Sequence, residues 1–375
     1  MSPIMAGIYV HIPFCASRCA YCAFYSTTLS ELRSAYVSAL IRELDLRTHY
    51  LNNKAVETIY IGGGTPSQLS ADDLRRLLTT LLTHVDVADY EFTMECNPDD
   101  VDMDLAQLLA SLRVNRVSMG VQSFHDVRLR QIGRRHTARQ AVEAVENLRR
   151  SGISNVSIDL MYGLPGQTFD EWQQDVAQAL SLRPSHVSAY ALSIEEDTPL
   201  WHQLQRGLIT ETDEETMRAM YFYIVDGLKS AGYEHYEISN FALPGYRSRH
   251  NSSYWDSTPY LGIGAAAHSY DGESRQWNIA DVEAYIAAIN EQRLPFECEI
   301  LNPDTKYNEL VMTSLRTSRG LNLDAVDAAR RSYCLRQAQR YIRSGWLLHE
   351  GHFLRITREG IFASDAVISD LLIVR

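Results

Sequence analysis

Short apolar runs alternate with longer amphipathic stretches over residues 7–231, and this alternation constrains the fold more than any other feature of the chain. The runs have the length of β-strands, while the longer stretches repeat apolar residues with helical spacing, as in Tyr36, Leu40, Ile41 and Leu44. Successive strand–helix units predict a parallel sheet covered by helices. The predicted strands are 7–12, 56–61, 90–95, 115–120, 155–160 and 186–192, and the predicted helices are 31–50, 70–83, 103–111, 137–151, 169–181 and 213–231.

Six such units predict an α/β fold, a barrel or partial barrel with six strands instead of eight. Active sites of these barrels lie at the C-terminal ends of the strands, so polar residues at those ends are candidates for a site. A tight turn, a helix cap or a buried carboxylate explains each candidate alone, but not their shared position after successive strands. The candidates are Gly62-Gly63-Gly64-Thr65-Pro66, Glu95, Gln122 and Asp159.

Three cysteines, Cys15, Cys19 and Cys22, follow the first predicted strand with the spacing C-x3-C-x2-C. Three thiolates at this spacing can hold three irons of a [4Fe–4S] cluster and leave the fourth iron open. Structural zinc prefers four ligands, usually as two C-x2-C pairs, and the other three cysteines of the chain are isolated. Disulfides are not expected because nothing indicates an oxidising compartment. The spacing therefore favours a reactive iron–sulfur cluster.

An open iron needs a chelating ligand, and S-adenosylmethionine offers an amino group and a carboxylate. One electron from the cluster would cleave a C–S bond of this cofactor and give a 5′-deoxyadenosyl radical. Glycine amides at Gly63 and Gly64 suit close approach of the methionine part, since a side chain there would clash. A carboxylate such as Glu95 or Asp159 suits ribose hydroxyls or a cationic ammonium group.

Composition and charge describe the whole chain. The 375 residues are enough for two domains, and the net charge of −12 argues against a general nucleic-acid binder. Residues 300–375 hold 11 Lys and Arg against 8 Asp and Glu, so they are basic while the rest is acidic. We predict a core barrel over 1–235, an extension over 236–299 and a C-terminal domain over 300–375.

The chain has no basic flank with an apolar run at its start and no stretch of about 18 apolar residues. Neither a signal peptide nor a transmembrane helix is therefore predicted. Together with reduced thiols, this favours a cytoplasmic protein.

The C-terminal domain is predicted to contain helices over 306–316, 323–331 and 333–344, followed by a hairpin that turns at Glu350-Gly351. Three helices and a hairpin indicate a winged-helix-like fold. Arg336, Arg340 and Arg343 occupy the last helix, where a nucleic-acid reader would carry them. Because the domain has a charge of only +3 and no other such feature, a solvated face is favoured.

Four stretches resemble the radical SAM superfamily, and more narrowly its HemN group of coproporphyrinogen III dehydrogenases. They are residues 9–15, 62–66, 118–124 and 159–165. The resemblance implies a (β/α)6 partial TIM barrel with a small C-terminal winged-helix-like HemN-type domain. It also implies a [4Fe–4S] cluster on Cys15, Cys19 and Cys22, and bound S-adenosylmethionine.

By the same resemblance, Tyr9, Gly63 and Glu95 contact the cluster-bound S-adenosylmethionine. A second S-adenosylmethionine in the HemN group is bound by residues that match five positions here, and an aromatic residue between the last two cysteines lines that site. The five positions are Gly64, Thr65, Gln122, Arg134 and Asp159, and the aromatic residue is Tyr21.

Two departures from HemN point to another branch. Cys22 is followed by Ala23-Phe24 where HemN has a further cysteine, and the long N-terminal extension of HemN is missing. Both features resemble the HemW branch of haem chaperones. The segment 249–255 also matches the H-N-x-x-Y-W motif of that branch, which is associated with haem binding.

His250 of this motif is the candidate haem contact, because a neutral imidazole is a standard axial ligand of haem iron. The alternative is an aromatic-rich segment whose histidine only forms hydrogen bonds to the barrel. A run of small residues, 262–268, ends at His268 and also matches the family. Close backbone packing explains that run, and the sequence does not favour His268 as a second axial ligand.

The HemW resemblance implies a chaperone that binds haem and passes it to haem-protein acceptors, including respiratory enzymes. It is compatible with transient membrane association through those acceptors and with a homodimer, and no nucleic-acid partner is expected. The alternative function is an oxygen-independent coproporphyrinogen III dehydrogenase, which decarboxylates two propionates to vinyl groups. A winged-helix regulator built on a disabled barrel is a third, more distant alternative. No catalytic residue is assigned.

Overall fold

The computed structural model describes residues 5–51, 54–85 and 87–374, and within these ranges one twelve-stranded sheet dominates the fold. Six of its strands run parallel in chain order, as the strand–helix alternation predicts. They are β1 (Met5–Ile12), β2 (Ala55–Gly63), β3 (Glu91–Cys96), β4 (Arg116–Gln122), β5 (Asn155–Tyr162) and β6 (His186–Ala191).

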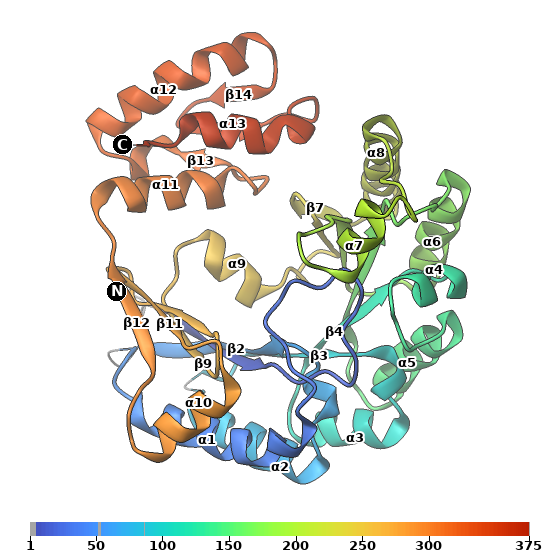
Figure 1. The fold of residues 1–375 in the computed structure, drawn as a ribbon. Helices are drawn as coiled ribbons and strands as arrows, with labels where there is room; N and C mark the ends of the chain where they lie inside the picture. Colours follow the sequence, from blue (N-terminus) through green and yellow to red (C-terminus); the bar gives the residue numbers. More distant parts are fainter. Residues whose placement is uncertain (1–4, 52–53, 86, 375) are drawn as a thin grey trace.

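Helices cover the outer face of these strands (Figure 1). Each predicted helix of the barrel is present, with ends that differ by at most a few residues. The α/β fold class, a six-unit partial barrel, is therefore confirmed. The helices are α1 (Arg33–Leu46), α2 (Ala71–Leu82), α3 (Met103–Ser111), α5 (Ala138–Arg150), α6 (Phe169–Leu182) and α8 (Glu214–Ser230), with the shorter α4 (Asp126–Gln131) and α7 (Pro199–Gln205) added between them.

Alternate residues of each parallel strand face opposite sides of the sheet, and the two sides differ in chemistry. Ile8, Val10 and Ile12 of β1 are fully buried in the main hydrophobic cluster with residues of the covering helices. The other side carries polar side chains such as Tyr60 and Glu95, which bond to each other. The inside of the barrel is therefore a polar site and not a packed core.

Short strands that the sequence does not predict extend the sheet at both edges. β7 (Glu234–Glu237) and β8 (Asn240–Ala242) follow β6, while β9 (Tyr260–Ile263) pairs in parallel with β1. Beyond β9 lie β10 (His268–Tyr270), β11 (Ser274–Asn278) and β12 (Phe296–Ile300), with α10 (Val282–Asn290) packed on α1. The helix α9 (Arg249–Trp255) contacts β2 and α11, between the barrel and the C-terminal part (Figure 1).

The C-terminal part contains α11 (Pro303–Ser314), α12 (Ala328–Arg343), α13 (Ser364–Leu371) and a small sheet in the order β13 (Leu321–Asn322), β15 (Phe353–Ile356), β14 (Leu347–Glu350). Its buried residues form a hydrophobic cluster of their own. The winged-helix-like arrangement and the hairpin are confirmed. Arg336 and Arg343 are exposed and Arg340 pairs with Asp370, as expected of a solvated face.

The prediction of separate helices over 323–331 and 333–344 is wrong. Residues Leu323–Ala325 form a single 3₁₀ turn, and one continuous helix runs from Ala328 to Arg343. Asp327 caps this helix by accepting the backbone N–H groups of Ala329 and Arg330 at 3.0 and 3.1 Å. The cap fixes the start of the helix, and no proline or glycine interrupts it afterwards.

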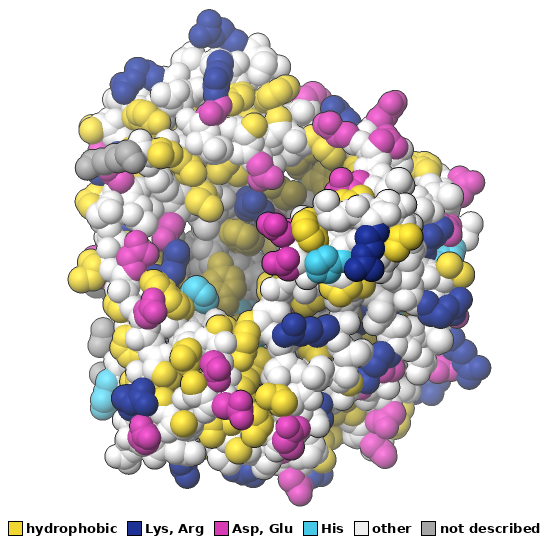
Figure 2. All heavy atoms as spheres, viewed as in Figure 1, with side chains coloured by type: hydrophobic (Ala, Val, Ile, Leu, Met, Phe, Trp, Pro, Cys, Tyr) yellow, Lys and Arg dark blue, Asp and Glu magenta, His cyan; other side chains and the backbone are white. Residues whose placement is uncertain are grey.

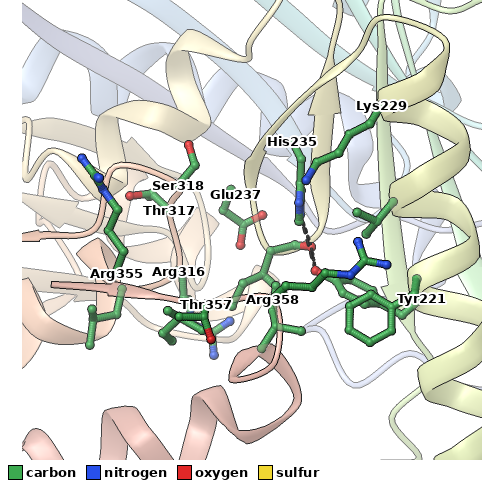
Figure 3. Close-up of a pocket in the computed structure, with 16 residues that line it drawn as sticks. Tyr221, Lys229, His235, Glu237, Arg316, Thr317, Ser318, Arg355, Thr357 and Arg358 are labelled. Carbon is green, nitrogen blue, oxygen red and sulfur yellow. Dashed lines mark hydrogen bonds between the residues drawn. The ribbon is translucent and has the colours of Figure 1, made fainter. Parts of the chain in front are cut away.

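A hollow opens between the barrel and the C-terminal part on the face shown in Figure 2. To one side, the two parts meet at a seam where Arg358 forms a two-pronged ion pair with Asp226 at 2.7 and 2.8 Å. Phe362 packs on Tyr221 and Phe222, with ring centroids 5.4 and 5.8 Å apart. A cavity of about 220 Å³ remains along this seam (Figure 3). No helix within the described residues is both long and apolar enough to cross a membrane.

Candidate functional site

The cysteine loop follows β1 and is held at several points by backbone hydrogen bonds. The N–H of Cys15 donates to the carbonyl of Thr27 at 2.9 Å, and the N–H of Ala20 donates to the carbonyl of Ile132 at 2.9 Å. Cys15, Cys19 and Cys22 are partly exposed, and all are free thiols. The loop thus presents three thiols at the end of β1, as the sequence predicts.

The three thiols lie near one another. No three His, Cys, Asp or Glu side chains of the described ranges converge closely enough to hold one metal ion. The thiols are nevertheless neighbours, because Cys15 and Cys19 each raise the pKa of Cys22, in addition to the larger effect of its burial. The ligands of a [4Fe–4S] cube bind separate irons and therefore stand further apart than the ligands of one ion.

Two polar side chains donate to sulfur in this loop. Thr65 Oγ1 donates to Cys15 Sγ at 3.5 Å, and Arg134 Nη1 donates to Cys19 Sγ at 3.4 Å. Such donors favour the thiolate form, which is the form that binds iron. They also link the cysteine loop to the segment after β2 and to the segment after α4.

The glycine loop, residues 62–66, lies directly against the cysteine loop, residues 15–22. Gly63 has φ +109°, and a Cβ on it would stand 2.5 Å from the His11 ring. A Cβ on Gly64 would meet the carbonyl oxygens of Ile12 and Phe14 at 2.8 Å. Both positions therefore require glycine. The predicted close approach exists, although the near neighbours are parts of the chain itself.

Glu95 joins the glycine loop to the inside of the barrel. Its carboxylate accepts the Gly63 N–H at 3.0 Å and the Tyr60 hydroxyl at 2.7 Å. The pKa of Glu95 is raised to about 7, mainly by burial and also by the nearby Asp159, against the lowering effect of these hydrogen bonds. Tyr9 stacks on Tyr60 with ring centroids 6.2 Å apart, so Tyr9, Gly63 and Glu95 form one group.

Arg134 belongs to the second predicted group, the residues that match the second S-adenosylmethionine site of the HemN group. Its guanidinium donates to the carbonyl of Gly120 and to Asn97 Oδ1, besides Cys19, while its buried Nε has no partner within the described residues. Gln122 ends β4 at φ +67°, a strained conformation for a residue with a side chain, and its amide lies beside Gly120 near the same guanidinium. Burial raises the pKa of Asp159 to about 6, and the Ser188 hydroxyl and Arg116 oppose this shift.

Tyr21 belongs to the cysteine loop itself, between Cys19 and Cys22. It packs with Ile132, Met161 and Leu164 in a small hydrophobic group. Its pKa is raised by burial, while Arg134 lowers it and Cys19 raises it further. All nine residues predicted to contact S-adenosylmethionine thus lie around the C-terminal ends of β1 to β5.

Sequence reasoning missed four residues that shape this site. His11 bonds Tyr9 through Nδ1 at 3.0 Å, Tyr60 bonds Glu95, and Asn97 accepts from Arg134. Arg116 is 1% exposed, and its Nε and Nη1 find no partner among the described residues. The two-residue alternation of the strands could have found His11 and Tyr60, since they share a face with Tyr9 and Gly62.

His250, the predicted haem contact, is enclosed within the fold. It is 0% exposed, its Nδ1 bonds Thr58 Oγ1 at 2.9 Å and its Nε2 bonds the Tyr254 hydroxyl at 2.9 Å. Burial, with a smaller effect of Arg116, lowers its pKa to about 3. Because both ring nitrogens are bonded inside the fold, this arrangement favours the alternative of a histidine that bonds the barrel.

Comparison with known proteins agrees with this geometry. Residues 9–179 match the radical SAM superfamily and residues 301–363 match the HemN C-terminal domain. The heme chaperone HemW of Lactococcus lactis is 41% identical, over 84% of this chain and 82% of its own length. This chain belongs to the HemW family. The heme chaperone HemW of Mycobacterium tuberculosis is 34% identical, over 98% of this chain and 94% of its own length.

Membership of the HemW family confirms the resemblance found in the sequence, including the choice of HemW over HemN. The family lies within the radical SAM superfamily, whose cofactors are a [4Fe–4S] cluster and S-adenosylmethionine. Among solved structures, the coproporphyrinogen III oxidase HemN of Escherichia coli matches with a TM-score of 0.84 at 22% identity. The match covers 98% of this chain and 90% of the HemN chain, and it shows that the two proteins share a fold.

Proposed function

We propose that this chain is a cytoplasmic haem chaperone that binds haem and passes it to haem-protein acceptors, with respiratory enzymes among them. In this proposal Cys15, Cys19 and Cys22 hold a [4Fe–4S] cluster, and the glycine loop receives S-adenosylmethionine. The observation that carries it is the presence of three free thiols and of the bonded pair Gly63 and Glu95 at one end of the barrel, with Thr65 of the glycine loop bonded to Cys15. The names of the HemW relatives support the haem-carrying part.

The residues of the site have separate roles in this proposal. When bound, the cluster supplies an electron for reductive cleavage of S-adenosylmethionine. Gly63 admits the methionine part, Tyr9 packs beside it, and Glu95 accepts hydrogen bonds from its ammonium or ribose groups. A second S-adenosylmethionine would contact the group around Arg134, which comprises Tyr21, Gly64, Thr65, Gln122 and Asp159.

His250 has a positioning role in the proposal. Its two ring hydrogen bonds and the bond from its N–H to Glu91 Oε1 at 3.0 Å hold α9 against β2 and β3. Contact with membranes through the acceptors, and a homodimer, are compatible with this function. No feature of the site specifically favours the alternative activity on coproporphyrinogen III, because the likeness to HemN extends only to the fold.

The proposal is tested with the full chain after anaerobic reconstitution of its cluster. Haem should bind saturably, and coproporphyrinogen III with S-adenosylmethionine and a reductant should give no decarboxylated product by chromatography. Cys19→Ser, which removes one cluster ligand, serves as the control for dependence on the cluster. Formation of a divinyl product by the unmodified chain would rule out a pure chaperone, and absence of saturable haem binding would rule out the chaperone itself.

A further inference from the structure

A second cavity lies at the outer edge of the sheet, where β10, β11 and β12 meet the segments 278–280 and 293–297. Its volume is about 610 Å³, within the range of roughly 300–1,000 Å³ that small-molecule and cofactor sites have. Trp277, Ile279, Leu294 and Phe296 line it. Ile279 and Phe296 are 42% and 38% exposed, so the wall offers apolar surface to a ligand.

One histidine, His268, faces this cavity and is exposed. Neither of its ring nitrogens has a hydrogen-bond partner in the part of the chain that the structure describes, in contrast to His250. Its ring stacks on Trp277 with centroids 6.2 Å apart and planes 30° apart. Burial on one side, with Arg275, lowers its pKa, so the imidazole is neutral at pH 7 and able to bind a metal.

The backbone that carries His268 is fixed by buried hydrogen bonds. Glu43, 0% exposed, accepts the N–H of Gly264 at 2.8 Å and the Asn278 side-chain amide at 2.7 Å. Gly264 has φ +101°, and a Cβ on it would stand 2.5 Å from the Tyr36 hydroxyl. The small residues before His268 therefore form a rigid turn, which is how proteins hold a ligand in place.

Arg293 gives the cavity a positive charge, and His268, which lines the cavity, lies near the cofactor site. Arg293 lines it, and its exposed pair with Glu291 is of the kind that contributes little energy, so the guanidinium can exchange partners. His268 lies close enough to His11 to lower the pKa of His11, whose ring borders Gly63. An occupant of the cavity would thus be a neighbour of the S-adenosylmethionine site.

We infer that this cavity binds haem, with His268 as an axial ligand of the iron, Trp277 and Phe296 against the macrocycle, and Arg293 beside a propionate. The inference rests on the proposed function and adds the site at which the haem is carried. Haem combines a flat apolar ring, an iron that takes imidazole and an anionic edge, and the cavity provides a partner for each.

The test is a titration of ferric haem into the full, cluster-reconstituted chain, followed by absorption and electron paramagnetic resonance. His268→Ala should weaken binding at least tenfold and abolish the imidazole-ligand spectrum. His268→Cys should restore binding with the spectrum of a thiolate ligand, a result that loss of a purely structural contact would not give. His349→Ala, at an exposed histidine of β14, should leave affinity and spectrum unchanged.

The outcomes separate the two proposals. If the unmodified chain binds haem while both His268 variants keep its affinity and spectrum, the site is wrong and the chaperone function stands. If the unmodified chain does not bind haem saturably, the proposed function fails and this inference fails with it.

Discussion

Gly63 shows how much a single residue of the site can be predicted. The triple glycine at the end of a strand indicates a close backbone approach, and φ +109° agrees, with the His11 ring only 2.5 Å from where a Cβ would stand. The partner cannot be predicted, because His11 lies 52 positions earlier and reaches Gly63 only through the pairing of β1 with β2. Spacing along a strand gives the face of a residue, whereas its neighbour depends on sheet register.

Replacing Gly63 by alanine should damage both stability and cofactor binding. Gly152→Ala is the matched control, because Gly152 has a similar φ of +98° but no atom within 4 Å of its would-be Cβ. We expect Gly152→Ala to cost about 1 kcal/mol and Gly63→Ala about 2–3 kcal/mol, from strain plus clash. Binding of S-adenosylmethionine, measured by calorimetry, should fall at least tenfold in Gly63→Ala alone. Equal affinities of the two variants would contradict the role of the glycine loop.

Glu95 should make stability depend on pH. Its folded pKa of about 7 lies above the ordinary value of 4.5, so the folded state binds the proton more tightly than the unfolded state. Stability from this group is therefore present at low pH and is lost as pH rises through about 7. Glu95→Gln should stabilise the cofactor-free chain at pH 8 relative to the unmodified chain and have little effect at pH 5. A difference in melting temperature that is the same at both pH values would refute this.

Helix α9 shows where a motif predicts an element but not its role. The H-N-x-x-Y-W segment does form a distinct element, whereas the link between its histidine and haem comes from resemblance alone. The structure gives His250 a hydroxyl partner, Thr58, that is 192 positions away in the chain. Contacts of this range carry no local pattern, so sequence periodicity cannot choose between a ligand and a buried hydrogen-bonded histidine.

His250→Ala should therefore lower the free energy of unfolding and leave the ligation of haem unchanged. The substitution leaves the hydroxyls of Thr58 and Tyr254 without their partner inside the fold and should cost about 2–3 kcal/mol of unfolding free energy. The haem spectrum of the folded variant should be unchanged. Ser252→Ala, on the same helix, should cost under about 0.5 kcal/mol. Loss of the imidazole-ligand spectrum at full thermal stability would show that His250 binds the iron instead.

The elements that sequence reasoning finds and misses differ in length. The six parallel strands have between six and nine residues and lie between amphipathic helices, so periodicity reveals them. The missed strands β7 to β12 have only three to five residues. Such short segments form strands because they pair with a neighbouring strand, and they show too little alternation of apolar and polar residues to be recognised in the sequence. The predicted break between two helices near residue 332 is wrong because the start signal lies earlier, at the Asp327 cap.

At the scale of the whole molecule, the charged groups inside the barrel are the least predictable part of the site. The rule that sites lie at strand ends identifies Glu95, Gln122 and Asp159. Arg116 is buried at the start of β4, whereas the rule considers only residues at the C-terminal ends of strands. Its electrostatic effect on Glu95 and Asp159 arises because the sheet curves and brings β3, β4 and β5 around one interior.

The seam between the barrel and the C-terminal part should couple their unfolding. Phe362→Ala removes the ring contacts to Tyr221 and Phe222, worth about 1–3 kcal/mol together. We expect calorimetry to resolve two unfolding transitions in this variant, because each part has its own hydrophobic cluster. Leu348→Ala, at an exposed residue of β14, should keep the original profile. An unaltered profile in Phe362→Ala would show that the seam contributes little to their coupling.

The central claim is that the molecule hands haem to acceptors, and a transfer experiment tests it most directly. The cluster-reconstituted chain, loaded with one equivalent of haem, is mixed with respiratory membranes prepared from haem-depleted cells. Haem incorporation is followed by difference spectroscopy and by recovered respiratory activity. We predict that incorporation from the loaded chain is faster than from the same concentration of free haem and that it slows with Cys19→Ser. Haem that stays on the chain, or that arrives no faster than free haem, would contradict the account.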